Sequence, residues 1–71
     1  MCEANGWYAY FDTANGQKPT PVAFWGDGGI GVVSRHSVER LTGELLAGKP
    51  PAMVSAELYT SFLGFARYDW Q

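Results

Sequence analysis

Three apolar runs separated by two turn dipeptides constrain the fold of the first half of this chain. The runs cover residues 7–11, 22–25 and 30–33, and Asn15-Gly16 and Asp27-Gly28 lie between them. Asn-Gly and Asp-Gly accept the positive φ angles that a type I′ turn requires at both central residues. The pattern therefore predicts a three-stranded antiparallel meander with two tight turns, and Gly28 is expected to have a positive φ.

With Asn15 and Gly16 as the turn residues, the side chains of the meander divide between two faces. One face is purely hydrophobic and is expected to form the core: Trp7, Ala9, Phe11, Val22, Phe24 and Val33. The other face carries more amphipathic side chains: Tyr8, Tyr10, Asp12, Ala23, Trp25, Ile30 and Val32. Pro19 and Pro21 cannot donate to a strand ladder, so irregular pairing is expected at the start of the second strand.

The hydrophobic spacing becomes helical in the second half of the chain. Val38, Leu41 and Leu45 recur at helical spacing, Ser37 suits the N-cap position, and Gly48 precedes two prolines. These signals predict a helix over residues 38–47.

A second helix is predicted over residues 52–66, where Val54, Leu58, Phe62 and Phe65 form one apolar stripe. Residues 62–70 also alternate as a strand would, and this alternative stays open. The predicted fold class is α+β: a three-stranded antiparallel β-meander packed by one or two α-helices on one face, with a C-terminal fourth strand as the alternative to the second helix.

Chain length and cysteine content limit how this fold can be stabilised. With 71 residues, one cysteine and one histidine, the chain forms a single small domain without a disulfide framework or a four-ligand zinc site. An aromatic content of 15% indicates a core of large rings, oligomerisation, or both. The unpaired Cys2 and the lack of a secretory signal predict a cytoplasmic protein, and no apolar run is long enough to cross a bilayer.

The sequence contains no constellation of catalytic, cofactor-binding or metal-binding residues. Residues 26–31 match the spacing of a dinucleotide-binding loop, but no βαβ unit follows, so a glycine-rich hairpin turn is the better interpretation. His36 is the only imidazole, and its serine neighbours indicate a polar connection between a strand and a helix. The carboxylates are dispersed along the chain. We therefore expect a protein that is not an enzyme and binds no cofactor.

The amphipathic aromatic face is the best candidate for a functional surface, because two short helices can readily cover only one face of a sheet. Tyrosine and tryptophan are enriched at interaction hot spots, and an open apolar face marks a partner site. The predicted partner-binding residues are Tyr8, Tyr10, Asp12, Trp25, Asp27 and Ile30. The alternative is that the second helix or residues 68–70 fold back over this face.

The leading interpretation is a protein–protein interaction module that occupies a surface of a larger protein or protein complex. A net charge of −2 favours a basic partner and disfavours direct binding of nucleic acid, since the cations are scattered along the chain. Two alternatives remain open. One is a nucleic-acid-associated module that stacks bases on the aromatic sheet, and the other is a small homo-oligomeric accessory subunit, such as a homodimer.

In its size, its acidity and its lack of catalytic motifs, the chain resembles the small inhibitors that phages and other mobile elements encode, including anti-CRISPR proteins. This resemblance implies an inhibitor that acts by covering a surface of its target. The sequence identifies neither that target nor the source organism.

Overall fold

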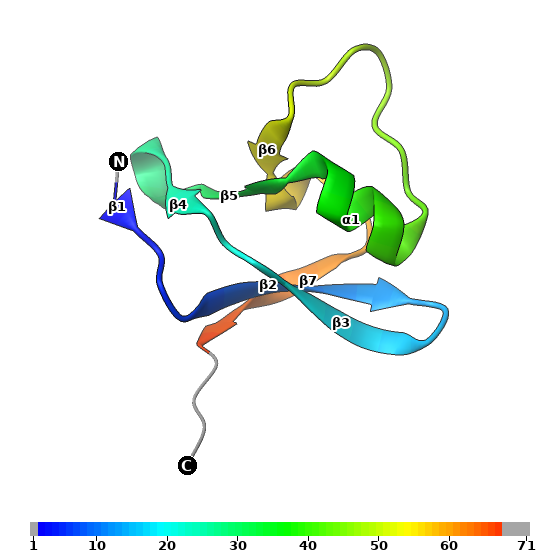
Figure 1. Cartoon of the computed structure of the whole chain (residues 1–71), viewed down its shortest axis with the longest axis horizontal. Helices are drawn as coiled ribbons and strands as arrows, with labels where there is room; N and C mark the ends of the chain where they lie inside the picture. The colour runs from blue at the N-terminus through cyan, green and yellow to red at the C-terminus, as the bar shows by residue number, and fades with distance from the viewer. Residues whose placement is uncertain (1, 68–71) are drawn as a thin grey trace.

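The structure is a computed structural model, and it describes residues 2–67 of the chain. Antiparallel sheets and one α-helix make up the fold (Figure 1). In chain order the elements are β1 Cys2–Glu3, β2 Trp7–Thr13, β3 Gly16–Pro21, β4 Phe24–Trp25, the 3₁₀ turn η1 Asp27–Gly29, β5 Gly31–Ser34, α1 Arg35–Thr42, β6 Met53–Ser55, the 3₁₀ turn η2 Ala56–Leu58 and β7 Phe62–Arg67.

The strands form two sheets rather than one meander. One sheet has the order β3-β2-β7, the other has the order β1-β4-β5-β6, and every pairing is antiparallel. The helix α1 lies on the same side of the first sheet as the second sheet does (Figure 1). The α+β class and a three-stranded antiparallel sheet covered by a helix on one face are therefore confirmed. The expectation that all three aromatic runs belong to one sheet is wrong.

The first hairpin, β2 with β3, is two residues away from the predicted register. Thr13 pairs with Gly16, so residues 14–15 form the tip in place of Asn15 and Gly16. Gly16 has a φ of 95°, and every positive φ among residues 2–67 belongs to a glycine. The only positive φ at this turn is thus that of Gly16, the first residue of β3, whereas a type I′ turn has a positive φ at both tip residues.

The slip by an even number of residues leaves every side chain of the hairpin on its predicted face. Ala9 and Phe11 are fully buried, and Thr20, which now pairs with Ala9, is also buried. The core face of β2 was therefore predicted correctly, although its pairing partners were not.

The second hairpin, β4 with β5, is short and is closed by η1. Trp25 pairs with Gly31, one residue away from the predicted partner Ile30. Gly28 has a φ of 75°, which confirms the predicted left-handed turn residue, and Gly29 follows with a φ of 81°. A slip by an odd number of residues turns the side chains of a strand toward the opposite face. The slip therefore changes the face that is expected for Trp25.

The helix covers Arg35–Thr42 instead of residues 38–47. Ser34 is its N-cap, and the Ser34 Oγ accepts a hydrogen bond from the N–H of Ser37. Gly43 was expected inside the helix but ends it, with a φ of 75° and its N–H donated to the carbonyl of Glu39. No helix in the described part of the chain is long and apolar enough to cross a membrane.

The predicted second helix does not form, because its residues complete the two sheets. The segment contains β6, η2 and β7, with Val54 paired to Val33 and β7 paired to β2. Leu58 of the expected apolar stripe is 59% exposed, whereas the neighbouring Tyr59 is 3% exposed. The strand alternative is confirmed for residues 62–67, and residues 68–70 lie outside the described residues.

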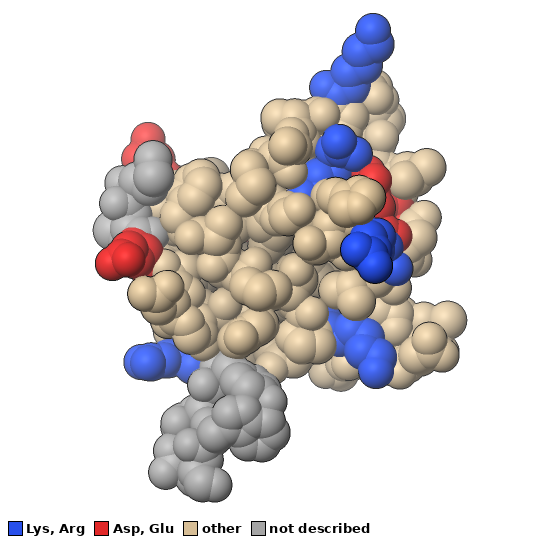
Figure 2. Space-filling view, in the orientation of Figure 1, with Lys and Arg blue, Asp and Glu red and all other residues tan. Residues whose placement is uncertain are grey.

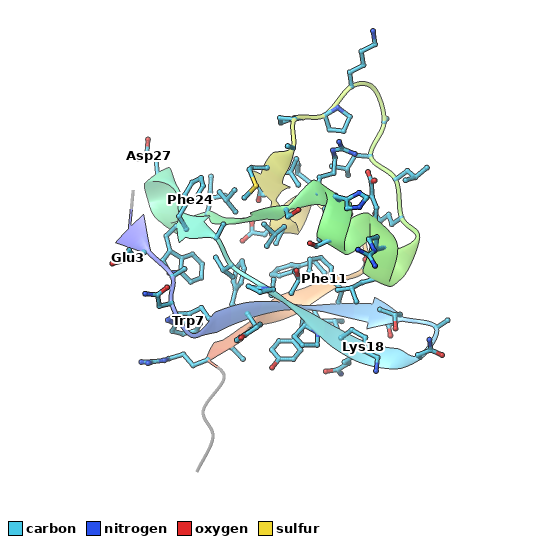
Figure 3. The ribbon with its side chains drawn as sticks, viewed as in Figure 1. Glu3, Trp7, Phe11, Lys18, Phe24 and Asp27 are labelled. Carbon is cyan, nitrogen blue, oxygen red and sulfur yellow. The ribbon has the colours of Figure 1, made fainter. Side chains whose placement is uncertain are left out.

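The core lies between the β3-β2-β7 sheet, the helix and the second sheet. It consists of the buried residues Ala4, Ala9, Phe11, Val22, Val33, Val38, Val54, Ala56 and Tyr59. Phe11 lies between its sheet and α1 (Figure 3), and its ring makes edge-on contacts with Tyr59 and Phe62, each with centroids 5.8 Å apart. Ala9 and Phe11 of β2 belong to this core, so the residues that alternate with them along β2 face outward.

Candidate protein-binding surface

Three of the predicted partner-binding residues lie together on the outer face of the β3-β2-β7 sheet, the face opposite α1. Tyr8, Tyr10 and Asp12 alternate along β2 with the buried Ala9 and Phe11, so they point away from the core. Both tyrosines are half-buried and Asp12 is exposed. Since β2 is the central strand, the two phenol rings lie in the middle of this face.

The neighbours of these tyrosines on the adjacent strands have short or rigid side chains. Tyr10 lies between Pro19 of β3 and Gly64 of β7, and Tyr8 has a proline and an alanine in the corresponding positions. The prolines and the alanine are exposed. The phenol rings are therefore the largest side chains on the outer face of this ladder, and none of α1, β1 and β4–β6 covers these neighbours.

The two prolines also determine how a partner can approach β3. This strand is at the edge of its sheet, and Pro19 and Pro21 occupy alternate positions on it. Proline has no N–H, so this half of the edge cannot donate the hydrogen bonds that an added strand would need. These two positions of β3 therefore do not favour the addition of a strand at this edge.

The other three predicted residues lie in or between β4 and β5 of the second sheet. The Trp25 ring packs edge-on against Trp7, with centroids 5.8 Å apart, and against Phe65, with centroids 5.0 Å apart. It therefore joins the two sheets and does not lie beside Tyr10. Asp27 is exposed in the η1 turn, at the end of the molecule far from the outer face (Figure 3), and Ile30, which is also exposed, directly follows this turn. The six predicted residues therefore do not lie on one sheet face, and their role in partner binding stays a prediction.

Charged side chains lie mainly at the rim of the molecule (Figure 2). Glu3 and Asp27 lie at the η1 end, and Lys18 lies at the opposite end of the β3-β2-β7 sheet (Figure 3). On the outer face Asp12 contributes a negative charge beside Gln17, its partner on β3. The face is thus aromatic at its centre and carries the carboxylate of Asp12 near the β2-β3 tip, where Lys18 follows Gln17 in the sequence.

Two ionisable groups with shifted pKa values lie away from the outer face. Burial raises the pKa of Glu44, but hydrogen bonds from Thr60 and Ser61 outweigh this effect and leave the pKa below its usual value. Burial raises the pKa of the Tyr59 hydroxyl, and the negative charge of Glu39 adds to the rise. Neither arrangement brings a nucleophile to a base, so neither provides the geometry of an active site.

Sequence reasoning identified the tyrosines of this surface but missed the residues that frame them. Pro19 and Pro21 were recognised only as residues that disturb a strand. Two prolines at alternate positions are, however, typical of a strand at the edge of a sheet. Gly64 was counted against a helix, and only the pairing of β2 with β7 shows that it lies opposite Tyr10. That pairing joins distant parts of the sequence.

Neither a metal site nor a relative modifies this picture. Within residues 2–67, no group of three or more His, Cys, Asp or Glu side chains could hold a metal ion. No family model matches the chain, and no curated protein or solved structure matches it significantly.

Proposed function

We propose that this chain is a non-enzymatic protein-binding module and that the outer face of the β3-β2-β7 sheet is its binding surface. The observation that carries the proposal is the position of Tyr10, on the central strand between Pro19 and Gly64. Interface energy concentrates in a few aromatic side chains that lose water on binding. Because two ladders already hold the backbone of Tyr10, little conformational freedom is lost when the ring is covered.

The partner is a larger protein or protein complex with a basic surface. The exposed Asp12 lies at one end of the outer face, where a carboxylate would steer a basic partner during encounter. A sequence with a single cysteine fits a reducing, cytoplasmic compartment. An inhibitor carried by a phage or another mobile element, similar in size and charge to anti-CRISPR proteins, is the narrower form of this proposal.

The Tyr10→Ala variant tests the surface directly. In pull-downs from the native host quantified by mass spectrometry, it should capture its partner about tenfold less efficiently or worse, as expected for a hot-spot tyrosine. Leu45→Ala is the matched control, since Leu45 is 74% exposed in the loop after α1 and its truncation also removes apolar surface. Capture should be unchanged in the control. Equal capture by wild type and a folded Tyr10→Ala variant would reject the surface.

The alternative functions give different results with the same protein. A homo-oligomer would appear as a mass above that of one chain in light scattering, and Tyr10→Ala would then dissociate it. A nucleic-acid module would bind a labelled oligonucleotide with an affinity that falls as the salt concentration rises. Either result without a protein partner would replace the proposal.

A further inference from the structure

One edge of the β3-β2-β7 sheet is formed by β7, and this edge has no partner strand in the described part of the chain. β7 is the last strand in the sheet order, so it is paired only on its β2 side. Apart from this ladder, residues 63–67 form no hydrogen bond within residues 2–67. A row of unpaired backbone N–H and C=O groups along a strand is a template for the addition of another strand.

The opposite edge of the sheet is protected against such an addition, whereas β7 is not. β3 carries Pro19 and Pro21, which cannot donate hydrogen bonds to an added strand. The six residues of β7 include neither a proline nor a lysine, two residue types that commonly protect an edge. A bulge at Leu63 interrupts the pairing with β2, and residues 64–67 pair regularly after it. Residues 64–67 are therefore the stretch with which an added strand would pair.

Exposed leucines accompany this edge. Leu63 of β7 is 51% exposed, and Leu58 of η2, the 3₁₀ turn that packs against β7, is 59% exposed. Both side chains would lose contact with water if another strand were added to β7. Removal of apolar surface from water is favourable, so the hydrophobic effect would add to the hydrogen bonds of the new ladder.

The two ends of β7 carry opposite charges. Arg67 is exposed at the last position of the strand, its guanidinium lies 6.0 Å from the centre of the Trp7 ring, and it forms no ion pair within residues 2–67. Just before the first position, the Glu44 carboxylate accepts hydrogen bonds from the N–H and hydroxyl groups of Thr60 and Ser61. No cation pairs with this carboxylate in the described part of the chain. Each end of β7 therefore has a charge without an ion-pair partner there, and the two charges differ in sign.

We propose that β7 pairs with β7 of a second copy of this chain in an antiparallel, two-fold symmetric dimer. Antiparallel pairing places the last residue of one strand beside the first residue of the other. Arg67 of each copy then lies at the Glu44 end of the other copy, and opposite charges attract across the shared ladder twice. A parallel arrangement would instead bring like charges together.

The same charges also lie on the same side of the sheet. Arg67 contacts Trp7, which packs against the core, and Glu44 follows α1, which covers the core side of the sheet. A two-fold axis perpendicular to the sheet keeps the core sides of both copies together. Because the edge of β7 is complementary to itself in this way, a second copy is the occupant that the structure favours. The proposal does not rest on the protein-binding surface, which stays open in such a dimer.

Light scattering of the purified full chain at increasing concentration tests the proposal. The mass should rise from that of one chain to that of two, and added salt should shift the equilibrium toward the single chain, because it screens the paired charges. Hydrogen exchange locates the contact. Exchange of the amides of residues 64–67 should slow as the dimer forms, whereas exchange of the amides of β3 should not change.

Two variants with matched controls test the contact residues. Leu63→Lys should weaken the dimer about tenfold or more, because it places a charge and removes apolar surface at the edge. Leu45→Lys makes the same change at a leucine that is 74% exposed in the loop after α1 and should leave the dimer unchanged. Arg67→Glu should weaken the dimer by bringing like charges together, whereas Arg40→Glu, at an exposed position of α1, changes the net charge equally and should have little effect. Thermal melts show that each variant is folded.

Three results would overturn the proposal. The first is the mass of one chain at every concentration, which would leave β7 without a second copy. The second is a dimer that withstands both Leu63→Lys and Arg67→Glu. The third is a dimer that Tyr10→Ala dissociates and Leu63→Lys does not, since the two copies would then meet through the outer face. Each result is obtained with the purified chain alone, so it is distinct from the outcome of the partner pull-down.

Discussion

At the scale of single residues, Gly31 shows how little space separates the two sheets. A Cβ at this position would overlap two ring atoms of Phe65 and would lie 3.0 Å from an atom of the Trp25 ring. Gly31 is in the second sheet and Phe65 is in the first, so the missing side chain is what allows this contact. From the sequence it was only one glycine of a turn, because the contact depends on how the sheets pack.

Gly31→Ala should lower the free energy of unfolding by about 1–3 kcal/mol, since the added methyl group must displace a packed aromatic ring. Denaturant unfolding followed by tryptophan fluorescence measures the change. Gly26→Ala is the matched control, because a Cβ there meets nothing closer than 3.6 Å and its φ is −83°. A Gly31→Ala protein as stable as the control would contradict the packing of Phe65 against β5.

At the scale of elements, Glu44 connects the loop after α1 to the turn before β7. Its carboxylate is held by Thr60 and Ser61, which lie sixteen and seventeen positions along the chain. The hydrogen bonds to the charged carboxylate lower its folded-state pKa below the usual value of 4.5. The ionised form therefore stabilises the fold above that value, and this stabilisation is lost as the pH falls through the folded-state pKa.

Glu44→Gln removes this titration and keeps the shape of the side chain. The wild type should lose more of its melting temperature than the variant does when the pH falls from about 6 to about 3. Thermal melts at several pH values give the comparison. Glu57→Gln, at an exposed position in η2, is the control and should behave as the wild type. Parallel pH profiles for wild type and Glu44→Gln would show that these hydrogen bonds do not stabilise the fold.

The elements also show what the sequence could predict. The two turn dipeptides located both hairpins, and the alternation along β2 identified Tyr8 and Tyr10 as outward-facing, because both signals are local. Helical spacing after Val38 found α1, although a left-handed Gly43 ended it early. The second helix was predicted wrongly because its apolar residues suit a helix and a strand alike. The segment forms strands because β7 pairs with the edge of β2 and β6 pairs with the edge of β5. These edges are known only from the fold.

At the scale of the whole molecule, the aromatic residues of the described chain other than Phe24 form two sets. One set joins the sheets through a series of edge-on or tilted ring contacts: Trp7, Trp25, Phe65, Phe62, Phe11 and Tyr59. The other set is the pair of tyrosines on the outer face. Trp25 belongs to the first set, in agreement with the odd slip in the second hairpin, and Asp27 and Ile30 lie at the η1 turn. Only three of the six predicted residues therefore share the outer face.

The central claim is that this chain binds a protein partner through the outer face of the β3-β2-β7 sheet. A photo-reactive amino acid at Gln17, which is exposed and pairs with Asp12, tests it while leaving Tyr10 intact. The same amino acid at Leu45 serves as the control. After irradiation in the native host, we expect a protein crosslinked from position 17 and none from position 45. Crosslinks to a partner from position 45 alone would contradict the claim.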